Sequence, residues 1–217
     1  MRHLPQLFAN NRAWATREIS RDPGFFTRLC AIQSPRYLWI GCADSRVPAN
    51  EIVGLAPGEL FVHRNVANIV RPDDFNCLAV LHYAIEMLHI TDVIVCGHYG
   101  CGGVQAALGA PVSEPLERWI SPIRAVRLRH AAAIDSCGDA AARWRRLCEL
   151  NVIAQVHELS RLPILAAPWA AGRPLNVHGW IYDLQDGLLR DLDVSVTQGQ
   201  PARRLADAPR TRGRRRR

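Results

Sequence analysis

The chain has 217 residues, of which 48% are hydrophobic and 22% are charged. These proportions exclude a disordered chain, a collagen-like repeat and a small disulfide-stapled protein, and the length suits one globular domain with a sizeable core. The net charge of +7 lies wholly in residues 201–217, which hold eight arginines and one aspartate. The sequence has no run of about 20 apolar residues and no secretory leader pattern, and its seven cysteines are an odd number. We therefore expect a cytoplasmic protein with reduced thiols and no membrane span.

The first predicted elements are two helices and two strands. Apolar residues at helical spacing predict a helix over 4–19. The pair Asp22 and Pro23 predicts the N-cap and first residue of a second helix that ends at Leu29. Short apolar runs bounded by turn residues predict two buried strands, at 36–41 and 59–63.

The rest of the chain alternates helical and strand-like patterns. In order, it predicts a helix from Asp74 to Leu88, a strand at 92–97, a helix at 102–108, helices at about 114–132 and 139–160, and a β region at about 174–193. This alternation predicts an α/β fold with a mostly parallel central β-sheet flanked by helices, within a catalytic domain spanning 31–198. The arginine-rich residues 199–217 are expected to form a disordered tail.

Two short segments concentrate the reactive side chains. GCADSRVP at 41–48 carries Cys42 and Asp44 after the first strand, and CGHYGCGG at 96–103 carries His98 and Cys101 after the third. If these strands are parallel neighbours, both segments meet beyond their carboxyl ends, where open α/β sheets bind ligands. Two thiolates, an imidazole and a carboxylate make a tetrahedral zinc set, whereas calcium and magnesium prefer oxygen ligands. The sequence therefore predicts a Zn²⁺ site.

Each half of this pattern also has a structural interpretation. Cys42 is compatible with a small buried residue and His98 with a hydrogen-bonded core histidine. The glycine-rich segment resembles a phosphate-binding loop but lacks the lysine of the Walker motif. The other cysteines are interpreted as packing residues, namely Cys30, Cys77, Cys96, Cys137 and Cys148.

Four motifs together resemble the β-class carbonic anhydrases. CADSRVP, PGELFVHRNVAN at 57–68, CGHYGCGG and HGWIYDLQDGLL at 178–189 occur in the order and at the spacing of that family. The resemblance runs from about residue 5 to residue 197. It implies zinc held by Cys42, His98 and Cys101, and reversible hydration of CO₂ to bicarbonate and a proton by zinc-bound hydroxide.

The resemblance also implies roles for further residues. Asp44 and Arg46 match a dyad in which Asp44 either pairs with Arg46 or binds the zinc as fourth ligand and stops catalysis. The matching substrate-binding positions are Gln33, Phe61, Val66, Tyr83 and the backbone N–H of Gly102. Trp39, Arg64 and Tyr182 resemble the non-catalytic bicarbonate site of a regulated subgroup, so the enzyme is expected to be allosteric.

The family resemblance further implies a homodimer or homotetramer, in which residues 1–30 form an N-terminal helical arm wrapped over a neighbour. Two alternatives remain open. The same zinc site hydrolyses COS or CS₂ in related proteins, and a nucleic-acid-binding protein with structural zinc would use the arginine tail. Because residues 1–200 are neutral and carry no nucleic-acid motif, we expect no specific nucleic-acid binding.

Overall fold

A computed structural model describes residues 3–31 and 33–197. The chain divides into two compact units, Met1–Ser34 and Pro35–Arg217, which are described separately. The predicted tail at 199–217 lies outside the described residues. Within them, no helix is long and apolar enough to cross a membrane.

The first unit contains two helices, α1 (Pro5–Arg21) and α2 (Phe25–Leu29). The predicted N-cap at Asp22 is wrong, because the backbone N–H of Asp22 bonds Glu18 O at 2.9 Å and closes α1 instead. The Asp22 carboxylate then accepts the Gly24 N–H, so α2 begins at Phe25 after a turn. Three aromatic rings pack edge to face within this unit, those of Trp14, Phe25 and Phe26.

The second unit is built on a five-stranded sheet with the order β2-β1-β3-β4-β5. The first four strands are parallel and β5 is antiparallel to β4, which confirms the predicted α/β fold. The three predicted strands form within two residues of their expected limits, and the predicted β region at about 174–193 contains the last two strands. The strands are β1 (Tyr37–Cys42), β2 (Leu60–Asn65), β3 (Asp92–His98), β4 (Asn176–Asp183) and β5 (Leu188–Asp191).

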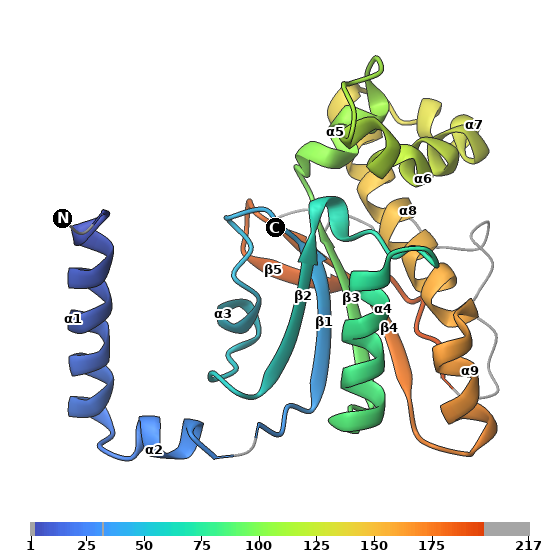
Figure 1. Cartoon of the computed structure of the whole chain (residues 1–217). Helices are drawn as coiled ribbons and strands as arrows, with labels where there is room; N and C mark the ends of the chain where they lie inside the picture. Colours follow the sequence, from blue (N-terminus) through green and yellow to red (C-terminus); the bar gives the residue numbers. More distant parts are fainter. Residues whose placement is uncertain (1–2, 32, 198–217) are drawn as a thin grey trace, which may run out of the picture. The chain divides into compact units, whose positions relative to one another are not determined.

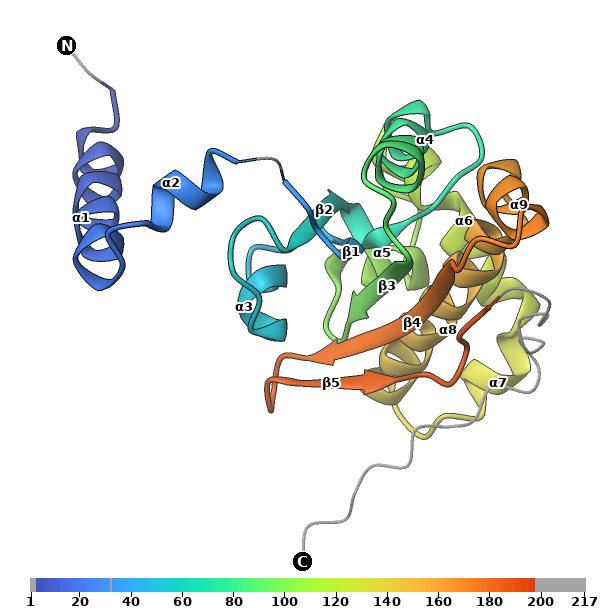
Figure 2. The same cartoon turned by 90° about the horizontal axis from the view of Figure 1, so that it is seen from below.

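Helices cover the two faces of the sheet unequally (Figures 1 and 2). The larger core lies between the sheet and the helices that include α4, α5, α6 and α8, and a smaller cluster around Trp39 packs under α3. The α-helices of this unit are α3 (Ala49–Val53), α4 (Phe75–His82), α5 (Gly102–Leu108), α6 (Leu116–Arg129), α7 (Ala131–Asp135), α8 (Ala140–Arg161) and α9 (Pro163–Ala170). A 3-10 turn, η1 (Val66–Asn68), follows β2, and a π-helical turn, η2 (Tyr83–Met87), extends α4.

The cysteines interpreted as packing residues are buried or half-buried, with one exception. Cys77, Cys96 and Cys148 are buried, and Cys137 is half-buried. Cys30 is exposed in the N-terminal unit, so its interpretation as a packing residue is wrong. It follows the short helix α2, none of whose residues is buried, and therefore has no apolar surroundings to pack into.

Asp74 is the N-cap of α4, and its removal is expected to destabilise the fold. Its carboxylate accepts the backbone N–H groups of Asn76 at 3.1 Å and of Cys77 at 3.4 Å. Replacing such a cap by alanine costs about 1 kcal/mol. Asp74→Ala should lower the free energy of unfolding in urea by that amount, with Asp73→Ala as the neighbouring control. An Asp74→Ala protein as stable as the control would contradict this role.

Candidate metal centre

Cys42, His98 and Cys101 converge at the carboxyl ends of two adjacent parallel strands. Cys42 is the last residue of β1 and His98 the last of β3, and Gly41 is in register with Cys96. Cys101 then precedes α5 as its N-cap residue. Gly100 turns the chain between His98 and Cys101 with φ of 74°, a left-handed conformation that glycine adopts without a side-chain clash. The two segments therefore meet as the sequence predicts.

The three potential ligand atoms form a compact, buried group. The Sγ atoms of Cys42 and Cys101 are 3.8 Å apart, and each ligand atom of the group lies within 4.8 Å of the others. His98 Nδ1 lies 3.0 Å from the carbonyl oxygen of Tyr99, which orients the ring. His98 Nε2 is buried and has no hydrogen-bond partner among the described residues. Such an orphaned nitrogen beside two thiols is what a tetrahedral zinc site requires, so these residues fit zinc.

The electrostatics of the thiol pair favour deprotonation of Cys42. A hydrogen bond from Cys101 lowers the pKa of Cys42 below its usual range, and the backbone N–H of Ala67, at 3.4 Å from Cys42 Sγ, acts in the same direction. The charge on Cys42 together with burial raises the pKa of Cys101 well above its usual range. A cation bound between them would favour the deprotonated form of both thiols, and this thiolate form is the one that binds zinc.

Asp44 lies beside this group and is paired with Arg46. Arg46 Nε donates to Asp44 Oδ1 at 2.9 Å and Arg46 Nη2 to Oδ2 at 2.7 Å, a bidentate arrangement. Asp44 Oδ2 is also 3.7 Å from His98 Nε2. The hydrogen bonds from Arg46 hold the pKa of the Asp44 carboxyl far below its usual range. Asp44 is therefore an ionised carboxylate close to the proposed ligands, but directed to Arg46.

Comparisons with known proteins show the family of the chain. The sequence profile described as carbonic anhydrase matches residues 37–189. A carbonic anhydrase of Emericella nidulans is 46% identical over 189 residues, covering 87% of this chain and 83% of that protein. The β-carbonic anhydrase of Coccomyxa, solved with acetazolamide, has a TM-score of 0.85 and 40% identity, covering 91% of this chain and 89% of the other. A tetrameric β-carbonic anhydrase of Sordaria macrospora has a TM-score of 0.84 and 38% identity, covering 88% and 97%.

The chain belongs to the β-class carbonic anhydrases. It is accordingly a zinc-dependent lyase, and the resemblance seen in its sequence is confirmed at the level of the family. The fold is that of the solved β-carbonic anhydrases.

The residues expected to bind substrate occupy four places in this carbonic anhydrase. The rings of Phe61 and Tyr83 stack with their centroids 5.8 Å apart. Val66 follows β2 and is 40% exposed. Gly102 opens α5 directly after Cys101, and no atom would lie within 4 Å of a Cβ placed there. Gln33 belongs to the other unit, Met1–Ser34, where it is exposed.

The residues expected to form the bicarbonate site lie on the face of the sheet covered by α3. Trp39 is buried, and Tyr182 packs partly buried against the same small cluster. Arg64 Nε donates to the carbonyl oxygen of Cys42 at 2.8 Å, and its Nη2 donates to that of Asp44. Arg64 thus holds the backbone of the segment that carries the proposed ligand Cys42 and the dyad.

A second group of potential ligands, His63, Asp74 and Cys77, was not singled out from the sequence. Its members already have protein partners, since Asp74 caps α4 and His63 Nε2 lies 3.2 Å from Asn65 Nδ2. Burial raises the pKa of the Cys77 thiol to about 12, so this thiol is neutral at physiological pH. These contacts give the group a structural role at the start of α4.

Sequence reasoning also missed the α8 residues that hydrogen-bond the backbone around the centre. Trp144 Nε1 in α8 donates to the carbonyl oxygen of Cys101 at 3.0 Å. Asn151 and Gln155, also in α8, are buried and bond the turn after β2. The sequence does carry a signal for these contacts, because two amides lie four residues apart on an otherwise apolar helix face. A buried amide requires a hydrogen-bond partner.

Proposed function

We propose that this carbonic anhydrase hydrates CO₂ reversibly to bicarbonate and a proton at a zinc site formed by Cys42, His98 and Cys101. The observation that carries the proposal is the buried, unpartnered His98 Nε2 beside two thiols, with the ionised Asp44 3.7 Å away. Zinc bound there would lower the pKa of a coordinated water to about 7 and so supply hydroxide at neutral pH.

Asp44 and Arg46 provide the proposed control of access to the metal. While Arg46 holds both carboxylate oxygens, Asp44 accepts hydrogen bonds at the edge of the site and leaves the fourth zinc position to water. When Arg46 releases it, the carboxylate is free to occupy that position itself. A zinc ion with four protein ligands has no place for water and is inactive.

The substrate-binding residues match the chemistry of CO₂, which has no dipole and accepts hydrogen bonds poorly. An apolar surface formed by Phe61, Val66 and Tyr83 would bind it without competing polar contacts. The backbone N–H of Gly102 would then orient one of its oxygens. The open space at Gly102 supports the presence of substrate there.

The choice of substrate is tested by stopped-flow rates with CO₂ and COS on the same zinc-replete protein. Hydration of CO₂ that is much faster than hydrolysis of COS is expected. A protein that hydrolyses COS or CS₂ and is inactive toward CO₂ would overturn the proposed substrate but retain the metal site. Deleting residues 201–217 should leave CO₂ hydration unchanged, because the proposed zinc ligands Cys42, His98 and Cys101 lie outside the deleted segment.

We also propose that bicarbonate regulates the enzyme through Trp39, Arg64 and Tyr182. Arg64 now bonds the carbonyl oxygens of Cys42 and Asp44, so an anion that attracts its guanidinium would loosen the segment holding the dyad. The Trp39 indole N–H and the Tyr182 hydroxyl offer further donors to such an anion.

Trp39→Phe tests this regulation, since phenylalanine keeps a buried aromatic ring and removes the indole N–H. The wild type should lose activity as bicarbonate accumulates and as pH falls, and the variant should lose this response. The inhibition curve for bicarbonate and the pH profile of CO₂ hydration measure it, with His178→Phe on the same sheet face as control. An unchanged response in Trp39→Phe would remove the site from the proposal.

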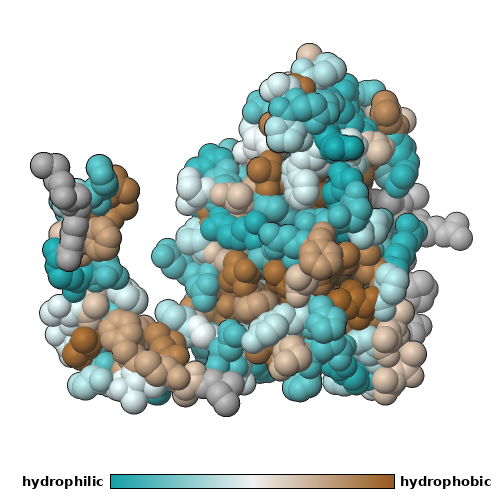
Figure 3. Space-filling view, viewed as in Figure 1, coloured by the Kyte–Doolittle hydropathy of each residue, from teal (hydrophilic) through white to brown (hydrophobic). Residues whose placement is uncertain are grey.

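A homo-oligomer is proposed from the apolar surface of the second unit. Brown, hydrophobic surface gathers in front of β2 and α4 (Figure 3). The large exposed apolar residues of η1, α4 and η2 are Val66, Phe75, Tyr83 and Met87. An apolar cavity of about 750 Å³ beside them is lined by residues of α4 and α9. Contiguous apolar surface of this kind marks an interface in a soluble protein, and the Sordaria macrospora relative is tetrameric.

The cytoplasmic location is likewise proposed, from the free thiols of the described chain.

A further inference from the structure

The turn after β2 has an unfavourable backbone that its own sequence does not explain. Ala67 has φ of 65° and Asn68 has φ of 49°, and both are in the left-handed region. That region costs a residue such as alanine about 1–2 kcal/mol, and asparagine less. Two such residues in succession require other contacts to hold them.

Amide side chains hold this turn from two sides. Asn65 bonds both the N–H and the carbonyl oxygen of Ile69, each at 2.8 Å. Asn151 Nδ2 donates to the carbonyl oxygen of Ala67 at 2.9 Å, and Gln155 Oε1 accepts the Val70 N–H at 2.9 Å. Gln155 Nε2 also donates to Asn151 Oδ1, so the two α8 amides act as a unit.

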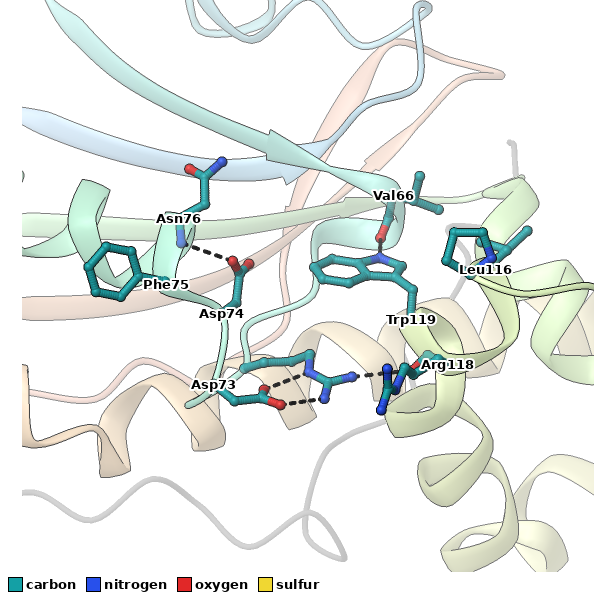
Figure 4. A pocket seen from close by; sticks show the side chains of 10 residues that line it. Val66, Asp73, Asp74, Phe75, Asn76, Leu116, Arg118 and Trp119 are labelled. Atoms are coloured by element: carbon teal, nitrogen blue, oxygen red, sulfur yellow. Dashed lines mark hydrogen bonds and ion pairs between the residues drawn. The ribbon is translucent and has the colours of Figure 1, made fainter.

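A tryptophan holds the preceding peptide group. Trp119 Nε1 in α6 donates to the carbonyl oxygen of Val66 at 2.8 Å, and both residues line a cavity of about 840 Å³ (Figure 4). The other end of that peptide group is the N–H of Ala67, which points at Cys42 Sγ at 3.4 Å. Trp119 therefore fixes the carbonyl of the same peptide plane whose N–H meets the sulfur.

The first turn of α5 closes the remaining side. A Cβ placed at Gly103 would lie 2.8 Å from Val66 Cγ1 and 3.1 Å from Ala67 Cβ. This close approach packs Ala67 directly against α5, the helix whose N-cap residue is Cys101. The peptide groups on both sides of Ala67 are thus bonded, one by Trp119 and the other by Asn151.

We propose that Trp119 and Asn151 are positioning residues of the metal centre, which hold the peptide groups flanking Ala67 so that its N–H donates to the Cys42 thiolate. The inference rests on the proposed zinc site. A hydrogen bond to a ligating thiolate fixes its orientation and withdraws negative charge from it. The two residues therefore act on zinc retention and on the electronic state of the zinc–sulfur bond without touching metal or substrate.

Trp119→Phe tests the inference, because it removes the indole N–H and keeps an aromatic ring at a half-buried position. The matched control is Trp169→Phe, whose indole N–H bonds the carbonyl oxygen of Leu175 at 2.8 Å, away from the centre. Asn151→Leu removes the second contact at similar side-chain volume. Should Asn151→Leu fail to fold, Trp119→Phe still decides the outcome.

Two measurements on the full chain separate positioning from general destabilisation. Zinc affinity is measured by chelator competition, and the thiolate-to-metal charge-transfer band is recorded on the Co²⁺-substituted protein. Zinc should bind about 10-fold more weakly to Trp119→Phe, and the band should move to longer wavelength as the thiolate loses its hydrogen bond. Trp169→Phe should match the wild type in both.

Two results would overturn the inference. If Trp119→Phe and Trp169→Phe show the same affinity and the same band as a zinc-binding wild type, the positioning role is wrong and the metal site stands. If the wild type binds no zinc, the proposed function is wrong and the inference falls with it.

Discussion

Replacing Cys101 by serine is expected to remove zinc from the protein and to reduce CO₂ hydration to the background rate. Serine keeps the size of the side chain, but its hydroxyl stays protonated at neutral pH and does not replace a thiolate ligand. The remaining Cys42 and His98 leave a site with two strong ligands. Metal analysis after dialysis against a weak chelator measures the loss directly.

The matched control is Cys77→Ser, which makes the same change at another buried thiol. Cys77 lies in the second group of potential ligands, with His63 and Asp74. Because Asp74 caps α4 and His63 bonds Asn65, we expect Cys77→Ser to retain its zinc and its activity while losing some stability. Zinc lost from Cys77→Ser and retained by Cys101→Ser would contradict the assignment of the metal centre.

Arg46→Ala is expected to reduce CO₂ hydration by about 10–100-fold while the zinc stays bound. The guanidinium now holds both oxygens of Asp44 and also donates to the carbonyl oxygen of Gly100 at 3.3 Å. The Asp44 carboxylate already lies 3.7 Å from His98 Nε2, so without the guanidinium it would be free to take the fourth zinc position. Stopped-flow hydration and metal analysis on the same sample distinguish blockage from metal loss.

Two controls accompany this variant. Arg46→Lys keeps the charge but not the bidentate geometry, so it should recover part of the rate. Arg173→Ala removes a guanidinium from Glu86 just before the amino end of β4, the end of the strand opposite the metal centre, and should leave the rate unchanged. An Arg46→Ala protein with full activity at every pH would show that Asp44 does not compete for the metal.

The charge state of Asp44 bears on any pH dependence that is observed. Arg46 keeps the pKa of this carboxyl far below its usual range, so Asp44 is ionised throughout the neutral range. Its own protonation therefore cannot cause a loss of activity near neutral pH. A group other than the Asp44 carboxyl, or bicarbonate itself, must cause the change if the enzyme switches there.

The parts of the fold that the sequence predicts well are those set by local patterns. The apolar runs before Cys42 and His98 place both residues at strand ends, and α5 has the predicted limits, Gly102–Leu108. The start of α2 was misplaced because Asp22 has two possible partners, the helix behind it and the helix ahead. Its backbone closes α1, and no local pattern decides between these choices.

The metal centre was predictable because its residues lie in two short segments whose strands are neighbours. Its supports were not, since Trp119 and Asn151 lie far along the chain from Val66 and Ala67, which they bond. Such contacts depend on how α6 and α8 pack on the sheet. The buried amides of α8 indicate that a polar partner exists, but they do not identify it.

The central claim is tested most directly by stopped-flow hydration of CO₂ with zinc-replete protein at mildly alkaline pH, with Cys42→Ser as the blank. Rapid hydration that is absent from the blank is the predicted result. Metal analysis shows whether the wild type holds zinc that the Cys42→Ser blank lacks. If it does, and its rate still equals that of the blank, the result contradicts CO₂ hydration as the reaction of this site.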